Sequence, residues 1–171
     1  MDHKKILLFL DDFTDRMALT GINVSEYNLD HVAFQVADSN EYEIVKTKFY
    51  TLGDLEHEAV VNGRRVGVFR LKKPIIYRSN TITAIELLEP KDGQLCIQGW
   101  EHAEFMIDDT FEELIAKYPN LNWDTISMNR PIYAHLKLKL SDNMQVKFNR
   151  LDVLSAVELD KKTIKIRSKI I

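Results

Sequence analysis

A short motif that occurs twice constrains this chain more than any other feature. Residues 30–38 read DHVAFQVAD and residues 101–109 read EHAEFMIDD. Each copy has an acidic residue, a histidine, a phenylalanine three positions later and a closing aspartate, and each leads into a helical pattern and then into strand-like segments. Agreement over several successive elements indicates an internal repeat. The sequence therefore predicts two tandem βαβββ units, at residues 28–90 and 99–150.

Alternating and helical periodicities around the motif predict the individual elements. An amphipathic helix over 3–20 comes first, with Gly21 after its end. The first unit is expected to contain a strand, a helix and three more strands, at 29–36, 39–53, 55–61, 66–71 and 81–88. Its Asn62-Gly63 pair predicts a hairpin turn. The second unit is expected to repeat this order at 100–107, 110–117 (with Asp109 or Thr110 as cap), 123–128, 133–140 and 144–148.

Two further segments complete the predicted architecture. Residues 89–98 contain Pro90 and Gly93 and are expected to link the units. Residues 151–171 form a C-terminal extension, for which the sequence predicts a short helix and then a basic, β-branched segment suited to an edge strand. Together the elements predict one α+β domain over 1–171, in which a curved mixed sheet surrounds a concave cup and an N-terminal helix precedes it.

Composition narrows the class of partner. The 171 residues suffice for one ordinary domain, the formal net charge is −3, and the 23 basic residues are spread along the chain, which gives no support for a nucleic-acid partner. A small molecule or another protein is the expected partner. The apolar run 6–10 is too short for a signal-peptide core, and no segment has the length of a membrane span. Cys96 is the only cysteine, so no internal disulfide is expected, and a cytoplasmic location follows as an expectation.

The predicted topology brings four polar side chains together. Pairing of the two units through their first strands would place His31 beside His102 across a pseudo-twofold axis. The fourth strands would add Glu86 and Lys147 on either side. The cup is therefore the expected functional site.

Strand alternation then predicts which neighbours face the cup. Gln35 and Glu104 are expected to point the same way as the histidines. Phe34, Phe105 and Glu101 are expected to face the opposite side, where helices cover the aromatic rings.

The chain resembles a known family in several stretches. These are DHVAFQV, VNGRRVGVFRLKKPI, TAIELLEP, GWEHAEF and VKFNRLDVLSAVEL, which together span residues 28–159. They resemble the YecM-like family within the vicinal oxygen chelate superfamily, which includes glyoxalases, extradiol dioxygenases and bleomycin-resistance proteins. A shared fold does not fix the chemistry. The resemblance also makes a homodimer an option, since related proteins often dimerise.

The resemblance implies metal ligands on the first and fourth strands of each unit. These positions fall on His31, Glu86 and His102, with Lys147 as the fourth. Two imidazoles and a carboxylate suit a divalent Zn, Fe, Mn, Ni or Co ion. Lys147 departs from the pattern, because a protonated lysine has no lone pair to offer a metal.

Two hypotheses from different classes follow. The leading one is a divalent-metal-dependent isomerase, lyase or dioxygenase that acts on a small polar molecule, with the metal as Lewis acid. Glu104 and Lys147 are its candidate catalytic residues: Glu104 as a general base or, preferably, as a group that orients a ligand, and Lys147 as a proton donor or a partner for an anionic group. The alternative is a metal-free binding or sequestering protein, in which a salt bridge between Lys147 and Glu86 replaces the ion.

For other polar residues the sequence gives weaker support for a place in the site. Gln35 and Arg70 are candidate substrate-binding residues, although Arg70 lies beside a hairpin where a solvated strand face is the default. His135 either lines the cup or faces solvent. Cys96, in the predicted linker, is assigned no role.

Overall fold

The computed structural model describes residues 3–167, with side chains through residue 163. Four α-helices, one 3-10 helix (η1) and eight strands follow one another in this part of the chain. In order they are α1 His3–Leu19, η1 Val24–Glu26, β1 Asn28–Gln35, α2 Ser39–Phe49, β2 Gly53–Val61, β3 Arg64–Tyr77, β4 Asn80–Leu88, β5 Gly99–Met106, α3 Phe111–Lys117, β6 Trp123–Asp124, β7 His135–Ser141, β8 Met144–Asn149 and α4 Val153–Arg167.

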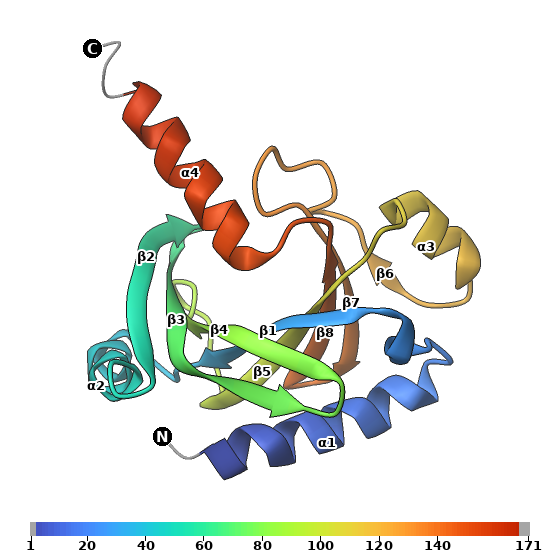
Figure 1. Ribbon diagram of the computed structural model, residues 1–171, viewed down its shortest axis with the longest axis horizontal. Helices are drawn as coiled ribbons and strands as arrows, with labels where there is room; N and C mark the ends of the chain where they lie inside the picture. The colour runs from blue at the N-terminus through green and yellow to red at the C-terminus, as the bar shows by residue number, and fades with distance from the viewer. Residues whose placement is uncertain (1–2, 168–171) are drawn as a thin grey trace.

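All eight strands form a single mixed sheet in the order β2-β3-β4-β1-β5-β8-β7-β6. Within each half the first and fourth strands are parallel neighbours, β1 with β4 and β5 with β8. The halves join through the antiparallel pair β1 and β5. The sheet is strongly curved (Figure 1). The predicted α+β fold, two tandem βαβββ units paired through their first strands and preceded by a helix, is therefore confirmed.

Helices cover the outer face of the sheet where the sequence places aromatic residues. Phe13 of α1 packs against Phe105 of β5, with ring centroids 6.0 Å apart. Phe34 of β1 packs edge-on against Phe49 of α2 at 6.1 Å. α1 runs along one side of the sheet, and α4 lies on the other side (Figure 1). The outward aromatic rings thus form the core, and the opposite face is left for the cup.

The first hairpin follows the predicted turn chemistry. Asn62 and Gly63 both have positive φ, 53° and 78°, as a type I′ turn requires. The third strand is longer than predicted, because the chain stays extended from Arg64 to Tyr77. Its pairing with β4 shifts register between Arg70 and Ile75, around a proline that has no N–H to donate.

The second unit departs from the predicted strand at 123–128. β6 has only two residues, because the Asp124 side chain accepts the Ile126 N–H at 3.1 Å and turns the chain. A long connection, residues 125–134, then leads to β7. The helix before it begins as expected: Thr110 caps α3 and forms a capping box with Glu113.

The predicted C-terminal edge strand is wrong. Residues 153–167 are helical in α4, and residues 168–171 lie outside the described part of the chain. Asp152 begins the helix by accepting the Ser155 N–H at 2.9 Å. Val153 and Val157 pack at helical spacing on Val68 and Ala84 of the sheet. The helix that these residues anchor continues through residues 163–167, where the β-branched composition predicted a strand. None of the helices that the structure describes is long and apolar enough to cross a membrane.

Candidate metal centre

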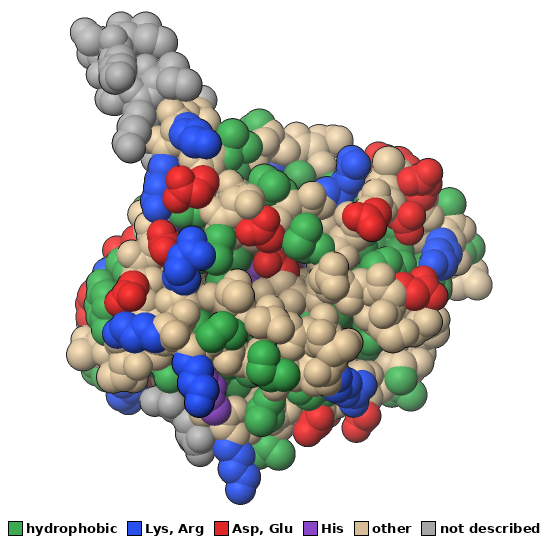
Figure 2. All heavy atoms as spheres, viewed as in Figure 1, with side chains coloured by type: hydrophobic (Ala, Val, Ile, Leu, Met, Phe, Trp, Pro, Cys, Tyr) green, Lys and Arg blue, Asp and Glu red, His purple; other side chains and the backbone are tan. Residues whose placement is uncertain are grey.

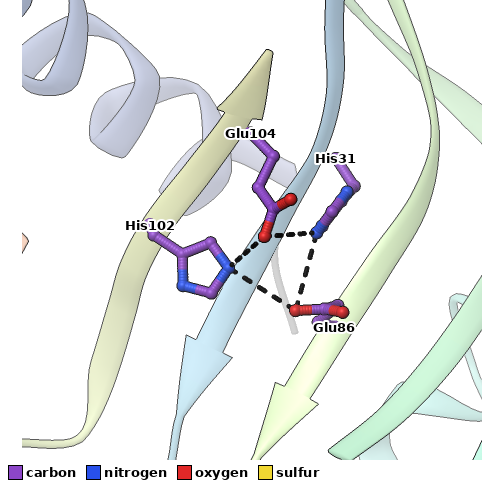
Figure 3. A group of neighbouring side chains, drawn as sticks. All are labelled: His31, Glu86, His102 and Glu104. Carbon is purple, nitrogen blue, oxygen red and sulfur yellow. Dashed lines mark ion pairs between the residues drawn. The ribbon is translucent and has the colours of Figure 1, made fainter. Parts of the chain in front are cut away.

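Four side chains converge on the concave face of the sheet (Figure 3). His31 comes from β1, Glu86 from β4, and His102 and Glu104 from β5. All four are buried, and one donor atom from each lies within 4.8 Å of the other three. The structure thus brings together the three sequence-predicted ligands. It adds Glu104 to the same donor set.

The spacing of these atoms matches a metal coordination sphere. Nε2 of His31 lies 3.5 Å from Oε2 of Glu86 and 3.6 Å from Oε1 of Glu104. Nε2 of His102 lies 3.5 Å and 3.2 Å from the same two oxygens. Ligands about 2.1 Å from an ion at the tetrahedral angle are about 3.4 Å apart. The four donors could therefore bind one divalent ion with little movement.

A β-bulge precedes each histidine. The register between β1 and β5 shifts between Leu29 and His31, which leaves Asp30 as the extra residue on β1. It shifts again where β1 residues 33 and 34 pair with His102 and Trp100, which leaves Glu101 as the extra residue on β5. A bulge breaks the two-residue alternation and re-aims side chains. The prediction that Glu101 faces the other side together with Phe105 is wrong for this reason.

The bulged carboxylates hold the two imidazole rings. Oδ2 of Asp30 lies 2.8 Å from Nδ1 of His31. Glu101 makes the equivalent contact with Nδ1 of His102 and also accepts a hydrogen bond from Gln145. A carboxylate behind each ring fixes the tautomer and raises the basicity of the far nitrogen, as is usual for metal-binding histidines. Both Nε2 atoms are therefore directed at the cup.

The ionisable groups of this cluster shift one another's pKa values. Burial lowers the pKa of His31, but the Glu104 and Glu86 carboxylates outweigh it and hold that pKa well above its ordinary value. Burial raises the pKa of Glu86 and of Glu104, yet His31 and Lys147, respectively, keep both well below the usual range. Even so, Nε2 of His31 is buried and has no hydrogen-bond partner among the described residues. A buried nitrogen without a hydrogen-bond partner that faces two carboxylates is suited to bind a cation together with them.

Lys147 occupies one edge of the donor set. Its Nζ donates to Oε1 of Glu104 at 2.6 Å and lies 2.8 Å from Nε2 of His102. Asn149 donates to the other Glu104 oxygen at 2.9 Å. Lys147 therefore pairs with Glu104, and the salt bridge with Glu86 that the metal-free hypothesis expects is not present among the described residues.

A cavity of about 560 Å³ opens from the cluster. The sheet forms its floor, and residues of α4 and of the connection 125–134 form much of its remaining wall. Six basic and four acidic side chains line it. The volume is suited to a small-molecule ligand.

The remaining predicted residues lie in different places. Gln35 is buried and accepts a hydrogen bond from Arg64 at 2.9 Å. Arg70 does not line the cavity: it is half-exposed and pairs with Glu56 at 2.6 Å, because it lies farther along β3, beside α4. His135 does line the cavity, with Nδ1 3.0 Å from the Tyr133 carbonyl. Arg64 directly follows the Asn62-Gly63 turn, and it lines the cavity, whereas the other arginines of the hairpin do not.

The fold and the cluster define the class: a paired βαβββ protein with a buried His2Glu2 donor set in its cup. The family described as YecM protein matches residues 3–171, so the chain belongs to that family and the predicted resemblance is confirmed.

Comparison with known proteins adds relatives at low identity. The chain is 29% identical over 121 residues to an uncharacterised Haemophilus influenzae protein, covering 71% of this chain and 61% of that protein. It is 26% identical over 116 residues to Protein YecM of Escherichia coli, covering 68% and 60%. The matched region thus spans about 60% of the length of these relatives.

Comparison with solved structures gives one that shares the fold and others with lower similarity. A structural-genomics protein described as EC4020 has a TM-score of 0.69 at 20% identity, covering 90% of this chain and 86% of that chain. A methylmalonyl-CoA epimerase from Streptomyces coelicolor has a TM-score of 0.49 at 13% identity, covering 72% and 98%.

Proposed function

We propose that this protein is a divalent-metal-dependent enzyme of the vicinal oxygen chelate type, which acts as an isomerase, lyase or oxidoreductase on a small polar molecule. His31, Glu86 and His102 hold the ion, and Glu104 is the fourth ligand. The observation that carries the proposal is the four-donor cluster, with histidine-to-glutamate distances of 3.2 to 3.6 Å and a carboxylate behind each imidazole. When bound, the ion would act as a Lewis acid that stabilises negative charge on a substrate oxygen.

Lys147 has a distinct role in this proposal. Nε2 of His102 has a single lone pair, so Lys147 gives up its contact there when that lone pair binds the ion. Its ammonium keeps the hydrogen bond to Glu104 and is free to turn toward the cavity that it lines. There it pairs with an anionic substrate oxygen or donates a proton to it.

His135 provides a neutral imidazole on the cavity wall. Burial lowers its pKa to about 4, and the nearby Lys147 ammonium adds to the effect. Its Nδ1–H donates to the Tyr133 carbonyl, which leaves Nε2 as an acceptor. At neutral pH His135 therefore orients a substrate hydroxyl by accepting its hydrogen bond.

One observation supports the metal-free alternative. The Lys147 ammonium already contacts two of the four donors, and with the His31 imidazolium it balances the Glu86 and Glu104 charges. A binding protein with this cup would retain its ligand after treatment with a chelator.

Metal analysis tests the proposal directly. The purified protein should contain a transition metal in about one-to-one amount, or acquire it on titration with Zn²⁺, Mn²⁺ or Co²⁺. Glu86→Gln and His102→Ala should abolish this binding, whereas His135→Ala, on the same cavity wall, should keep it. Circular dichroism would verify that each variant is folded. Absence of metal binding by the folded parent, or full binding by both ligand variants, would contradict the proposal.

A further inference from the structure

We propose that Arg64 forms an oxyanion-binding subsite in the cavity, so that the substrate carries a carboxylate or phosphate besides the oxygens that approach the metal. This inference rests on the proposed function for the metal end of the ligand. The subsite itself depends on Arg64, on Gln35 behind it, and on the charge of the cavity wall.

Gln35 holds the Arg64 side chain in place. The Gln35 amide is buried, and its Nε2 donates to two backbone carbonyls, Val36 at 3.0 Å and Leu88 at 3.1 Å. These bonds fix the amide orientation and direct Oε1 at the guanidinium, whose Nη1 donates to it at 2.9 Å. The partner is a neutral amide, so it positions the guanidinium without cancelling its charge.

The neighbouring arginines of β3 have carboxylate partners, which cancel their charge. Arg65 pairs with Glu43 and Glu89, and Arg70 pairs with Glu56. No carboxylate in the described part of the chain lies within ion-pair distance of Arg64. Of these three arginines only Arg64 lines the cavity. An arginine that is both positioned and unpaired keeps most of its five N–H donors for a planar or tetrahedral oxyanion.

The rest of the cavity wall reinforces this preference. Two of the six basic side chains are neutralised, Lys137 by Asp124 at 2.7 Å and Lys147 by Glu104 at 2.6 Å. The other basic side chains on this wall have no ion pair within the described ranges: Arg64, Lys91, Arg130 and Arg150. On the face of the molecule that Figure 2 shows, basic and acidic side chains are mixed, whereas basic side chains outnumber acidic ones in the cavity. A concave wall with an excess of one charge concentrates ligands of the opposite charge.

The arrangement also gives the ligand a direction. Gln35 is four residues beyond His31 on the same strand, which corresponds to about 13 Å between Cα atoms at the usual rise per residue. His31 at one end lines the cavity, and so does Arg64, which Gln35 contacts at the other end. A compact molecule would therefore present adjacent oxygens to the donor cluster and an oxyanion to Arg64.

Matched ligand pairs test the subsite by isothermal titration calorimetry on the full-length protein, with and without Co²⁺. The pairs are 2-oxoglutarate against 2-oxopentanoate, 2-oxoadipate against 2-oxohexanoate, and 3-phosphoglycerate against glycerate. In each pair both molecules have adjacent oxygens, and only the first has the additional oxyanion. The parent should bind the oxyanion member of at least one pair on the order of tenfold more tightly, the usual size for a charged hydrogen bond. The first two pairs test for binding of a carboxylate, and the third pair tests for binding of a phosphate.

Two variants separate the effect of the Arg64 subsite from the effect of positive charge elsewhere on the protein. Arg64→Gln should remove the preference without lowering Co²⁺ affinity, and Arg70→Gln, which removes the same charge elsewhere on β3, should leave it intact. If the parent binds no metal but keeps an oxyanion preference that Arg64→Gln removes, the subsite stands and the proposed metal function fails. If the parent shows no preference in any pair, or if Arg64→Gln keeps one, the subsite is overturned whatever the metal result.

Discussion

The two halves of the cup share one topology but place opposite charges at its centre. In the first half, β1 and β4 contribute His31 and Glu86, two groups with lone pairs for a metal. In the second half, β5 and β8 contribute His102 and Lys147 at the equivalent positions. A nearly symmetric scaffold thus makes a polar site with two different flanks. One flank offers donor atoms that suit a cation, and the other carries a cationic side chain of its own.

The outer strands differ as well. The first half has a long hairpin, nine residues in β2 and fourteen in β3. In the second half β6 has two residues, and the connection 125–134 takes its place beside the cavity. The first half is therefore a regular sheet wall, and the second half closes the cavity with irregular chain.

Replacing Lys147 with methionine should produce the largest change, because it removes the charge that distinguishes the halves. At an effective dielectric constant of about 20, an ammonium about 4 Å from a divalent ion is repelled by several kcal/mol, part of which is relieved when the side chain turns away. We expect Lys147→Met to raise Co²⁺ affinity by about 100-fold, since 1.4 kcal/mol corresponds to a factor of about ten. A competition titration with a coloured chelator measures this.

Lys137→Met is the matched control for that experiment. Lys137 on β7 lies opposite Lys147 on β8 in the sheet register and also lines the cavity. Asp124 neutralises the charge of Lys137. Its replacement should leave metal affinity nearly unchanged. An unchanged or lower affinity in Lys147→Met would show that this lysine does not compete with the ion.

The bulged carboxylates provide a second, smaller contrast. Oδ2 of Asp30 accepts both the His31 ring N–H and the Val153 N–H at the start of α4, the latter at 2.9 Å. Glu101 accepts from its own histidine and from a side chain of β8. Asp30→Ala and Glu101→Ala should each weaken metal binding on the order of tenfold, as loss of a ligand-orienting partner usually does. Only Asp30→Ala should also loosen α4.

Hydrogen exchange of the α4 amides separates the two variants. Faster exchange at the start of α4 is expected in Asp30→Ala and not in Glu101→Ala, because only Asp30 bonds the helix backbone. Equal exchange in both variants would mean that the contact with Val153 does not couple His31 to the helix over the cup.

Periodicity and the internal repeat were sufficient to predict most of the fold. Apolar residues at regular intervals mark the strands and helices of both units. The repeat puts each histidine at the equivalent position of its unit. It also correctly predicts that the halves pair through their first strands. The helix at the start of the C-terminal extension was predicted, but its continuation to Arg167 was not, because the β-branched residues of that segment favour a strand.

The site was predictable where alternation holds and not where it fails. His31, Glu86, His102 and Glu104 were expected on one face and converge there. Asp30 and Glu101 are different, because a bulge is a property of two paired strands and leaves no signature in one of them. The same limit applies to the arginines of the first hairpin, whose ion pairs depend on residues far along the chain.

The smallest expected effect concerns acid stability of the first half. Arg65 makes a two-point contact with Glu89, Nε to Oε2 at 3.0 Å and Nη2 to Oε1 at 2.8 Å, and so fastens β3 to the end of β4. The guanidinium lowers the pKa of Glu89 to about 2. Because the folded pKa lies below the unfolded value of about 4.3, the pair stabilises the fold above that pH, and its contribution is lost as pH falls from about 4.3 to 2.

Urea unfolding between pH 7 and pH 2 measures this contribution. Glu89→Gln should lower the free energy of unfolding at pH 7 by about 1 kcal/mol, the range of a partly exposed pair with good geometry, and the difference from the parent should vanish near pH 2. In the second half, Lys139 and Asp142 form a fully exposed pair at the β7–β8 turn. Asp142→Asn should have no measurable effect at any pH, since solvent screens such pairs. Equal losses in the two variants would mean that the Arg65 contact stabilises its half of the sheet no more than an exposed pair does.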